Sequence, residues 1–240
     1  MRRFIVTVVA LKLTLVVGFF MLFVASETAV QEAAKGVATP TPKTQTSDCI
    51  NRPTSEPYTG ALSIFEDENR AKNLQIDRVM DILSISDKKN VADIGAGSGW
   101  FTVRAAKRIG MGKVFAVEIN QQYIDHINAR AENEKLPNIK TILGKPNDPL
   151  LPLNSIDVVM VLKTYHEIAE PIRLMKNVRK SLRKDGLVAI IDKNGIGDDH
   201  GLDKESVINE MKQAGFKLRD QYDFVKADGM DYFLVFEVMK

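Results

Sequence analysis

The sequence predicts an α/β protein with a doubly wound, mostly parallel sheet of seven strands, helices on both faces and an antiparallel edge strand. Short apolar runs alternate with amphipathic segments of helical period, which is typical of βαβ units. Right-handed crossovers between parallel strands then place helices on both faces of the sheet. Only the turn 226–229 separates the last two expected strands, so these strands should form a closing hairpin.

The first half of the fold is expected to contain three strands and three helices. Apolar residues at helical spacing predict helices at 74–83, 101–109 and 121–134, of which Gly110 closes the second and Pro137 follows the third. Short apolar runs predict strands at 90–94, 113–117 and 139–143. The first of these strands runs directly into a glycine-rich turn.

The second half begins with the run 156–162, which is almost wholly apolar. We therefore expect it to be a central strand that is buried on both faces. Helical periodicity predicts helices at 171–182 and 204–214, and a glycine follows each of them. The remaining strands are expected at 187–191, 216–225 and 231–238.

Composition limits the classes of function that the chain can have. The chain has 240 residues and a formal net charge of +2, so no strong basic field favours nucleic acid as a partner. Its single cysteine, Cys49, excludes an internal disulfide and any cysteine-based metal cluster within one chain.

Residues 1–26 are expected to be a signal peptide or an N-terminal membrane anchor. Arg2 and Arg3 precede an apolar run over 4–24 that contains one charge, Lys12. A basic start, a short apolar run and small residues at its end are typical of a cleaved secretory signal, whereas the length of the run also suffices for an anchor. Both alternatives export the rest of the chain, and the anchor would keep it in contact with the membrane.

Residues 27–57 are expected to form a flexible tether. They are rich in Ala, Thr, Ser and Pro and contain few large apolar residues, so they cannot bury enough surface to fold by themselves. The folded domain is therefore expected over 58–240.

A glycine-rich loop, Gly95-Ala96-Gly97-Ser98-Gly99, joins the first expected strand to the next helix. Glycines let a backbone turn sharply and approach a ligand, and the start of the helix offers free N–H groups. Glu118 ends the second strand, where a carboxylate can accept hydrogen bonds from both hydroxyls of a ribose. Together these features predict an adenosine-type ligand at the carboxyl ends of the strands.

Neighbouring residues narrow the choice of ligand. A dinucleotide fold would need glycine or alanine where this chain has Trp100, and the Gly-Lys-Ser/Thr of a phosphate-binding loop is absent. The run VADIGAGSGWFT at 91–102 resembles the first motif of class I S-adenosylmethionine-dependent methyltransferases. Later motifs of that family are resembled in the same order at 117–118, 143–152, 155–159 and 182–186, and the resemblance as a whole covers roughly 65–240.

The resemblance implies a Rossmann-like methyltransferase fold with S-adenosylmethionine as its cofactor. The cofactor-binding residues that it implies are Asp93, Gly95, Ala96, Gly97, Gly99, Glu118, Asn147, Asp148, Leu162 and Lys163. The glycine loop would approach the methionine part, Glu118 would hold the ribose hydroxyls, and either Asn147 or Asp148 would face the adenine amino group. Leu162 and Lys163 would line the site near the methyl group.

His166 and Tyr165 are the candidate catalytic residues, because they follow the fourth strand. Methyl transfer from a sulfonium is an in-line displacement in which the protein mainly positions the nucleophile and takes its proton. A histidine can accept a proton near neutral pH, and the tyrosine could orient a hydroxyl. The alternative is that both side chains only pack. His126 is expected on a helix surface and His200 in a loop that could cover the site, so we expect no metal site.

The methyl acceptor stays open between a small molecule, a lipid and a protein. Asn/Asp-Pro-Pro-Tyr is absent after the fourth strand, and the domain has no cysteine, which argues against two kinds of nucleic-acid base methylation. Two other functions remain as alternatives: a catalytically silent cofactor-fold module held at the membrane, and an NAD-dependent oxidoreductase.

Overall fold

The computed structural model describes residues 48, 50–226 and 228–240. The leader predicted over 1–26, Cys49 and most of the predicted tether lie outside the described residues. Within the described part of the chain, no helix has both the length and the apolar character that a membrane span requires.

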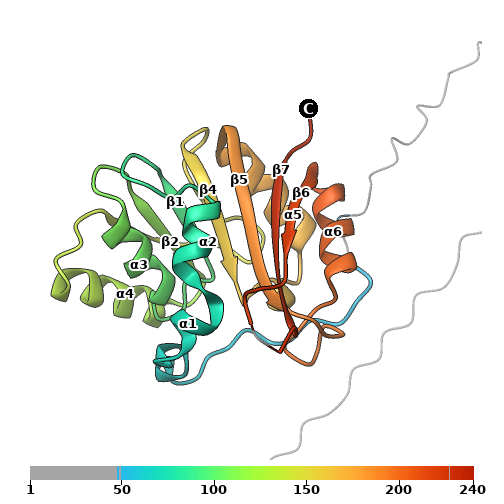
Figure 1. Cartoon of the computed structure of the whole chain (residues 1–240), viewed down its shortest axis with the longest axis horizontal. Coiled ribbons are helices and arrows are strands. Elements are labelled where there is room, and N and C mark those ends of the chain that lie inside the picture. Colours follow the sequence, from blue (N-terminus) through green and yellow to red (C-terminus); the bar gives the residue numbers. More distant parts are fainter. Residues whose placement is uncertain (1–47, 49, 227) are drawn as a thin grey trace, which may run out of the picture. The chain divides into compact units, whose positions relative to one another are not determined.

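A seven-stranded sheet forms the centre of the domain, with the strand order β3-β2-β1-β4-β5-β7-β6 (Figure 1). The strands are β1 (Val91–Ile94), β2 (Val114–Glu118), β3 (Ile139–Leu143), β4 (Ile156–Leu162), β5 (Leu182–Lys193), β6 (Phe216–Tyr222) and β7 (Asp231–Val238). Neighbouring strands from β3 to β5 are parallel, whereas β7 runs antiparallel to both β5 and β6. The predicted fold class is confirmed, and the antiparallel strand of the closing hairpin lies one position in from the edge strand β6.

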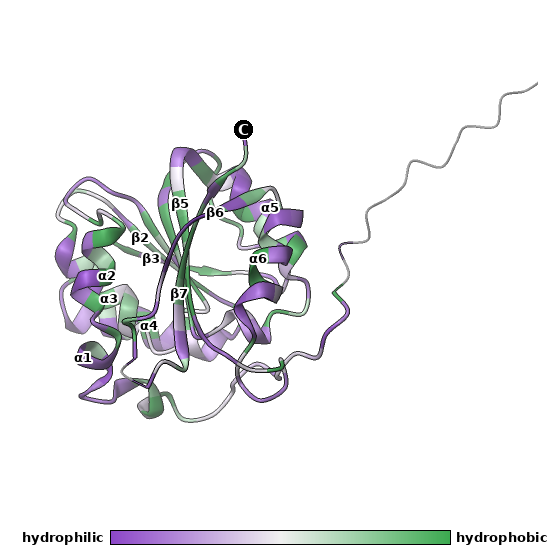
Figure 2. Cartoon of the chain, turned by 45° about the vertical axis from the view of Figure 1, so that its right-hand side comes forward, coloured by the Kyte–Doolittle hydropathy of each residue, from purple (hydrophilic) through white to green (hydrophobic). Residues whose placement is uncertain are grey.

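Helices cover both faces of the sheet. They are α1 (Arg70–Leu74), α2 (Ile76–Ile82), α3 (Trp100–Arg108), α4 (Gln121–Asn133), α5 (Pro171–Ser181) and α6 (Lys204–Gln213), with short 3-10 helices η1 (Leu62–Glu66) and η2 (Tyr165–Glu167). Buried residues of α2, α3 and α4 share one hydrophobic cluster, and those of α5 and α6 share a second. The central strands are hydrophobic over most of their length, while the helices also carry hydrophilic residues (Figure 2).

Strand β4 connects the two clusters, as its apolar sequence predicts. Met160 and Leu162 belong to the cluster with α3, whereas Val159 and Val161 belong to the cluster with α5. Alternate residues of a strand point to opposite faces, so β4 is buried on both sides.

Three elements differ clearly in extent from the sequence-based expectation, and one of them is β6, which ends at Tyr222 and not at the expected residue 225. The helix expected over 74–83 is broken at Gln75, whose left-handed backbone (φ 45°) separates α1 from α2. Strand β5 begins before the expected 187–191, because Leu182 pairs with Ile156 ahead of an irregularity in the register.

Residues 50–57, which were predicted to belong to the tether, contact the domain instead. Arg52 Nε donates a hydrogen bond to Glu210 Oε1 on α6 at 2.6 Å, and both side chains are almost buried. Ser55 Oγ donates to Gly197 O at 2.9 Å and accepts from His200 N at 3.1 Å. The prediction is wrong for these residues, because low hydrophobicity prevents independent folding but not polar attachment to a folded surface.

Arg52→Ala is expected to lower the free energy of unfolding by about 2 kcal/mol. A buried ion pair broken on one side costs about 3–5 kcal/mol, and release of the segment into water would relieve part of that cost. Urea denaturation followed by circular dichroism measures the change. The control is Arg173→Ala, which removes the largely exposed pair with Glu170 and should have little effect. Equal effects of the two substitutions would show that Arg52 does not hold the segment on the domain.

Candidate functional site

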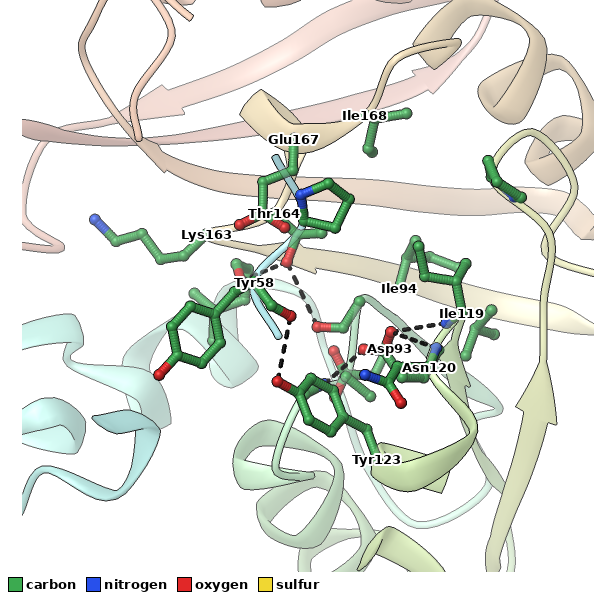
Figure 3. A pocket seen from close by; sticks show the side chains of 18 of the residues that line it. Tyr58, Asp93, Ile94, Ile119, Asn120, Tyr123, Lys163, Thr164, Glu167 and Ile168 are labelled. Atoms are coloured by element: carbon green, nitrogen blue, oxygen red, sulfur yellow. Dashed lines mark hydrogen bonds between the residues drawn. The ribbon is translucent and has the colours of Figure 1, made fainter. Parts of the chain in front are cut away.

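A cavity of about 720 Å³ lies at the carboxyl ends of β1, β2 and β4. The chain leaves β1 toward β2 on one side, and β4 lies on the other side, so the cavity is at the switch point where doubly wound sheets bind ligands. Its volume is within the range of small-molecule sites, roughly 300–1,000 Å³. Figure 3 shows side chains from these strand ends around it, together with Tyr58 from the N-terminal segment.

The glycine loop forms one wall of the cavity. Gly95 and Gly97 have φ values of 70° and 54°, in the left-handed region that glycine tolerates best. Gly95 N donates to Val117 O at 2.9 Å, which fixes the loop to the end of β2. Of the glycine-loop residues predicted to bind the cofactor, Gly95, Ala96 and Gly97 line the cavity, whereas Gly99 lies outside the lining, and a Cβ there would be 3.2 Å from Ile127.

Glu118 lines the cavity with a carboxylate that the backbone holds in place. Its Oε2 accepts from Gly97 N at 3.0 Å, and its Oε1 accepts from Ile119 N at 2.7 Å and from Asn120 N at 3.3 Å. Ionised carboxylate oxygens have further lone pairs for a ligand. The side chain is therefore oriented before any ligand arrives, at the position where the sequence predicts a ribose contact.

Asp93 is buried at the end of β1 and also lines the cavity. Burial raises the pKa of Asp93 to about 6, although the hydrogen bond from Thr102 Oγ1 (2.6 Å) and the charge of Arg70 oppose the rise. Arg70, on α1, lies with its guanidinium 4.6 Å from the ring centroid of Trp100. Sequence reasoning missed Arg70 as a lining residue because it precedes the recognised motif and only the fold brings it to the cavity.

Leu162, which ends β4, and Lys163, which follows it, are among the residues that line the cavity. The Lys163 side chain extends away from the other labelled residues (Figure 3), and its ammonium forms an ion pair with the buried carboxylate of Asp231. The charge of Lys163 is therefore neutralised within the protein and does not face the cavity.

The turn η2 presents Glu167 to the cavity, and neither predicted catalytic residue lines it. Tyr165 is completely buried, burial raises the pKa of its hydroxyl, and that hydroxyl has no hydrogen-bond partner among the described residues. His166 is 4% exposed, and its Nδ1 lies 2.9 Å and 3.0 Å from the two carboxylate oxygens of Asp192. Burial raises the pKa of Glu167 to about 7, and the charge of His166 opposes the rise. Glu167 was missed because nothing in the sequence shows which residue of the turn faces inward.

The loop expected to hold adenine turns its candidate side chains elsewhere. Asn147 Nδ2 donates to Glu170 Oε1 at 2.8 Å, and Asp148 Oδ1 accepts from Leu150 N at 2.9 Å. Neither residue lines the cavity. The residues of this loop that do so are Lys145, Pro146 and Pro149. The adenine contact predicted for Asn147 or Asp148 thus gains no support from the arrangement of the loop.

The N-terminal segment forms a further part of the cavity wall. The hydroxyl of Tyr123, on α4, donates a hydrogen bond to Tyr58 O at 3.2 Å (Figure 3) and shares it with Gly60 O at 3.0 Å. The Tyr58 ring meets the Phe65 ring edge to face, with centroids 5.4 Å apart. Residues 54–59, most of which were assigned to the tether, therefore help to enclose the site.

Comparisons with known proteins show that this chain is similar to methyltransferases. A family model described as "Methyltransferase domain" matches residues 91–186. An uncharacterized methyltransferase of Mycobacterium tuberculosis is 28% identical over 143 residues, which are 60% of this chain and 54% of that protein. The chain thus spans about half the length of the curated relatives of this kind that it matches.

Solved structures share the fold at low sequence identity. A SAM dependent methyltransferase from Aquifex aeolicus has a TM-score of 0.68 at 18% identity, covering 74% of this chain and 97% of that one. A cyclase named SpnF has a TM-score of 0.59 at 12% identity, covering 78% of this chain and 98% of that one. One fold therefore accompanies more than one named reaction, and the reaction must be inferred from the site.

Proposed function

We propose that the chain carries a class I S-adenosylmethionine-dependent methyltransferase domain, and that it transfers a methyl group to a small-molecule, lipid or protein acceptor. One observation carries the proposal: the N–H of Gly97 holds the carboxylate of Glu118 at the wall of a cavity that the glycine loop encloses. A loop of this kind beside an oriented carboxylate suits an adenosyl ligand.

The residues around the cavity fit the cofactor part by part. Glu118 would accept the ribose hydroxyls, and the apolar side chains of Ile94 and Ile119 would border the adenosyl group. Asp93 and Arg70 carry opposite charges on the same cavity, and they would complement the ammonium and carboxylate of the methionine part. When bound, S-adenosylmethionine supplies a methyl group on a positively charged sulfonium.

The acceptor is proposed to enter beside the segment after β4. Thr164 and Glu167 line the cavity there, and Tyr58 lines it from the N-terminal segment. These side chains would position the acceptor for in-line attack and exclude water. Glu167 thereby takes the position at which the sequence suggested His166.

A screen for methyl acceptors tests the proposal. The full chain is incubated with S-adenosylmethionine and pools of small molecules, lipids and proteins, and the formation of S-adenosylhomocysteine is measured. Turnover that depends on one pool and is lost in Glu118→Ala supports methyl transfer. Cofactor binding without turnover on any pool would favour the catalytically silent module instead.

Cofactor affinity is expected to fall as the pH drops below about 6. Protonation of Asp93, whose pKa burial raises to about 6, removes a negative charge that attracts the sulfonium and ammonium of the cofactor. The loss should approach about tenfold per pH unit if only the ionised form binds. Calorimetric titrations between pH 5 and 8 measure it.

Asp93→Asn is the matched control, because its affinity should be lower and nearly independent of pH in this range. The free energy of unfolding of the ligand-free protein should depend on pH in the opposite direction to cofactor affinity. The pKa of Asp93 is raised in the fold, so the folded state binds more protons than the unfolded chain from about pH 4 to 6, and stability falls as the pH rises. The same pH dependence of affinity in Asp93→Asn would assign the titration to another group.

We also propose export of the domain, either behind a cleaved signal or on an anchor, because of the basic start and the apolar run at 4–24. N-terminal sequencing of the mature chain distinguishes the two alternatives. A cytosolic chain that begins at Met1 would contradict both.

A further inference from the structure

Two histidines and a glutamate from two separate segments of the chain converge beside the cavity. His166 and Glu167 belong to η2, and His200 belongs to the loop after β5. Candidate ligand atoms of the three side chains all lie within 4.8 Å of one another. His166 Nε2 lies 3.8 Å from Glu167 Oε1, and the His166 and His200 ring centroids are 5.9 Å apart.

Asp192 fixes the ring of His166 in the orientation that metal ligands need. Its two oxygens lie 2.9 Å and 3.0 Å from His166 Nδ1, and Oδ2 also accepts from the His166 backbone N–H at 3.1 Å. An ionised carboxylate only accepts, so Nδ1 carries the hydrogen toward Asp192, and Nε2 is the ring nitrogen that would bind a metal ion in its deprotonated form. Nε2 is the atom that faces Glu167. A buried carboxylate behind a histidine is the usual outer partner of a metal-bound imidazole.

The loop that carries His200 is held at several points. The backbone N–H of His200 donates to Ser55 Oγ at 3.1 Å, and Gly197 N donates to Gly201 O at 2.8 Å across the loop. Leu202 N donates to Lys193 O at 2.7 Å, which ties the loop to the end of β5. His200 itself is exposed, so a solvated ion can reach its ring.

We propose that His166, Glu167 and His200 bind a divalent first-row transition-metal ion, with Asp192 as a positioning residue. Two imidazoles and one carboxylate suit zinc and related ions, and sites with three protein ligands keep further positions open. In a tetrahedral zinc site, ligand atoms about 2.1 Å from the ion lie roughly 3.4 Å from one another. Here His166 Nε2 and Glu167 Oε1 lie 3.8 Å apart and all the ligand atoms lie within 4.8 Å of one another, so metal binding needs only modest side-chain movements.

The site goes beyond the proposed function, because metal binding needs neither cofactor nor acceptor. Glu167 also lines the cavity, so an open coordination position borders the space where an acceptor would enter. An acceptor with an oxygen donor, such as a hydroxyl or a carboxylate, could occupy that position.

The test is a calorimetric titration of the untagged full chain with ZnCl2 after treatment with a chelator. All proteins carry Cys49→Ser, which removes the single thiol as a competing ligand. One zinc ion per chain is expected to bind. His200→Ala should weaken binding by at least about 100-fold, since losing a direct ligand exceeds the roughly 10–100-fold cost of losing an outer partner. MgCl2 should give no heat, because Mg²⁺ prefers oxygen ligands.

His126→Ala is the matched control, because it removes an exposed histidine on α4 and should leave zinc affinity unchanged. Asp192→Asn should weaken binding about 10–100-fold and alter the visible absorption of bound Co²⁺, which a purely structural role would leave unchanged. No zinc binding by the reference chain would overturn the proposal. Equal affinities of His200→Ala and His126→Ala would overturn it as well, whether or not the chain binds S-adenosylmethionine.

Discussion

Gly95→Ala is expected to destabilise the domain by about 2–4 kcal/mol and to abolish measurable cofactor binding. Gly95 has a φ of 70°, so any side chain there meets left-handed strain of about 1–2 kcal/mol. A Cβ at this position would also lie 2.7 Å from Thr164 Oγ1 and 2.9 Å from Thr164 Cβ. Thr164 follows β4, so the clash would push the glycine loop and the strand end apart. Urea denaturation and calorimetry measure the two effects.

Gly229→Ala separates the strain from the clash. Gly229 has a φ of 67°, almost the value of Gly95, but a Cβ there would meet nothing within 4 Å. This variant should lose only the strain energy and keep its cofactor affinity. If both glycine variants lose the same stability and both bind the cofactor, close packing of Gly95 against Thr164 does not shape the site.

Glu118→Ala is expected to weaken cofactor binding by about 100- to 1,000-fold. A hydrogen bond to a charged group contributes about 1.5–3 kcal/mol, and two ribose hydroxyls would share the carboxylate. A loss of about 3–4 kcal/mol corresponds to two or three powers of ten in Kd. Calorimetric titration with S-adenosylhomocysteine measures the change without turnover.

Glu118→Gln provides the control for this effect. Its amide keeps one acceptor oxygen of nearly the same shape, so its affinity should lie between those of the parent chain and Glu118→Ala. Glu118 also accepts from the backbone N–H groups of Gly97 and Ile119, so thermal unfolding without ligand must be compared for all three proteins. An unchanged Kd in Glu118→Ala would remove the carboxylate from the binding site.

The sequence predicts the sheet well where local patterns are strong. The apolar run of β4 and the glycine that follows β1 identify strands and their ends without help from the rest of the chain. Gln75 shows where prediction from local patterns fails. The apolar residues on both sides of it keep helical spacing, but the backbone at Gln75 is left-handed and interrupts the helix. The break leaves buried residues on both sides of it, Leu74 of α1 and Ile76 of α2, in the first hydrophobic cluster.

The site likewise contains some residues that the sequence predicts and others that it does not. Gly95 and Glu118 are predictable because a loop and a strand end carry their signals within a few residues. The inward direction of Glu167 and the pairing of His166 with Asp192 depend on parallel pairing between β4 and β5. No pattern along the chain records such a contact.

The N-terminal segment illustrates a third kind of difference. Composition correctly indicates that residues 50–57 cannot fold alone, but Arg52 and Ser55 attach them to α6 and to the His200 loop. The segment therefore contributes to the cavity even though it has no hydrophobic core of its own. Shortened versions of the chain that are made for binding experiments should therefore keep residues 50–57.

The most direct measurement is a calorimetric titration of the full chain with S-adenosylmethionine and, separately, with S-adenosylhomocysteine and NAD. We expect one binding site per chain for the first two ligands, no heat with NAD, and a large loss of affinity in Glu118→Ala. Absence of heat and of any thermal stabilisation by either adenosyl ligand at millimolar concentration would contradict the assignment of the cavity as a methyl-donor site. Thermal stabilisation of the chain by NAD, but by neither adenosyl ligand, would indicate an oxidoreductase instead.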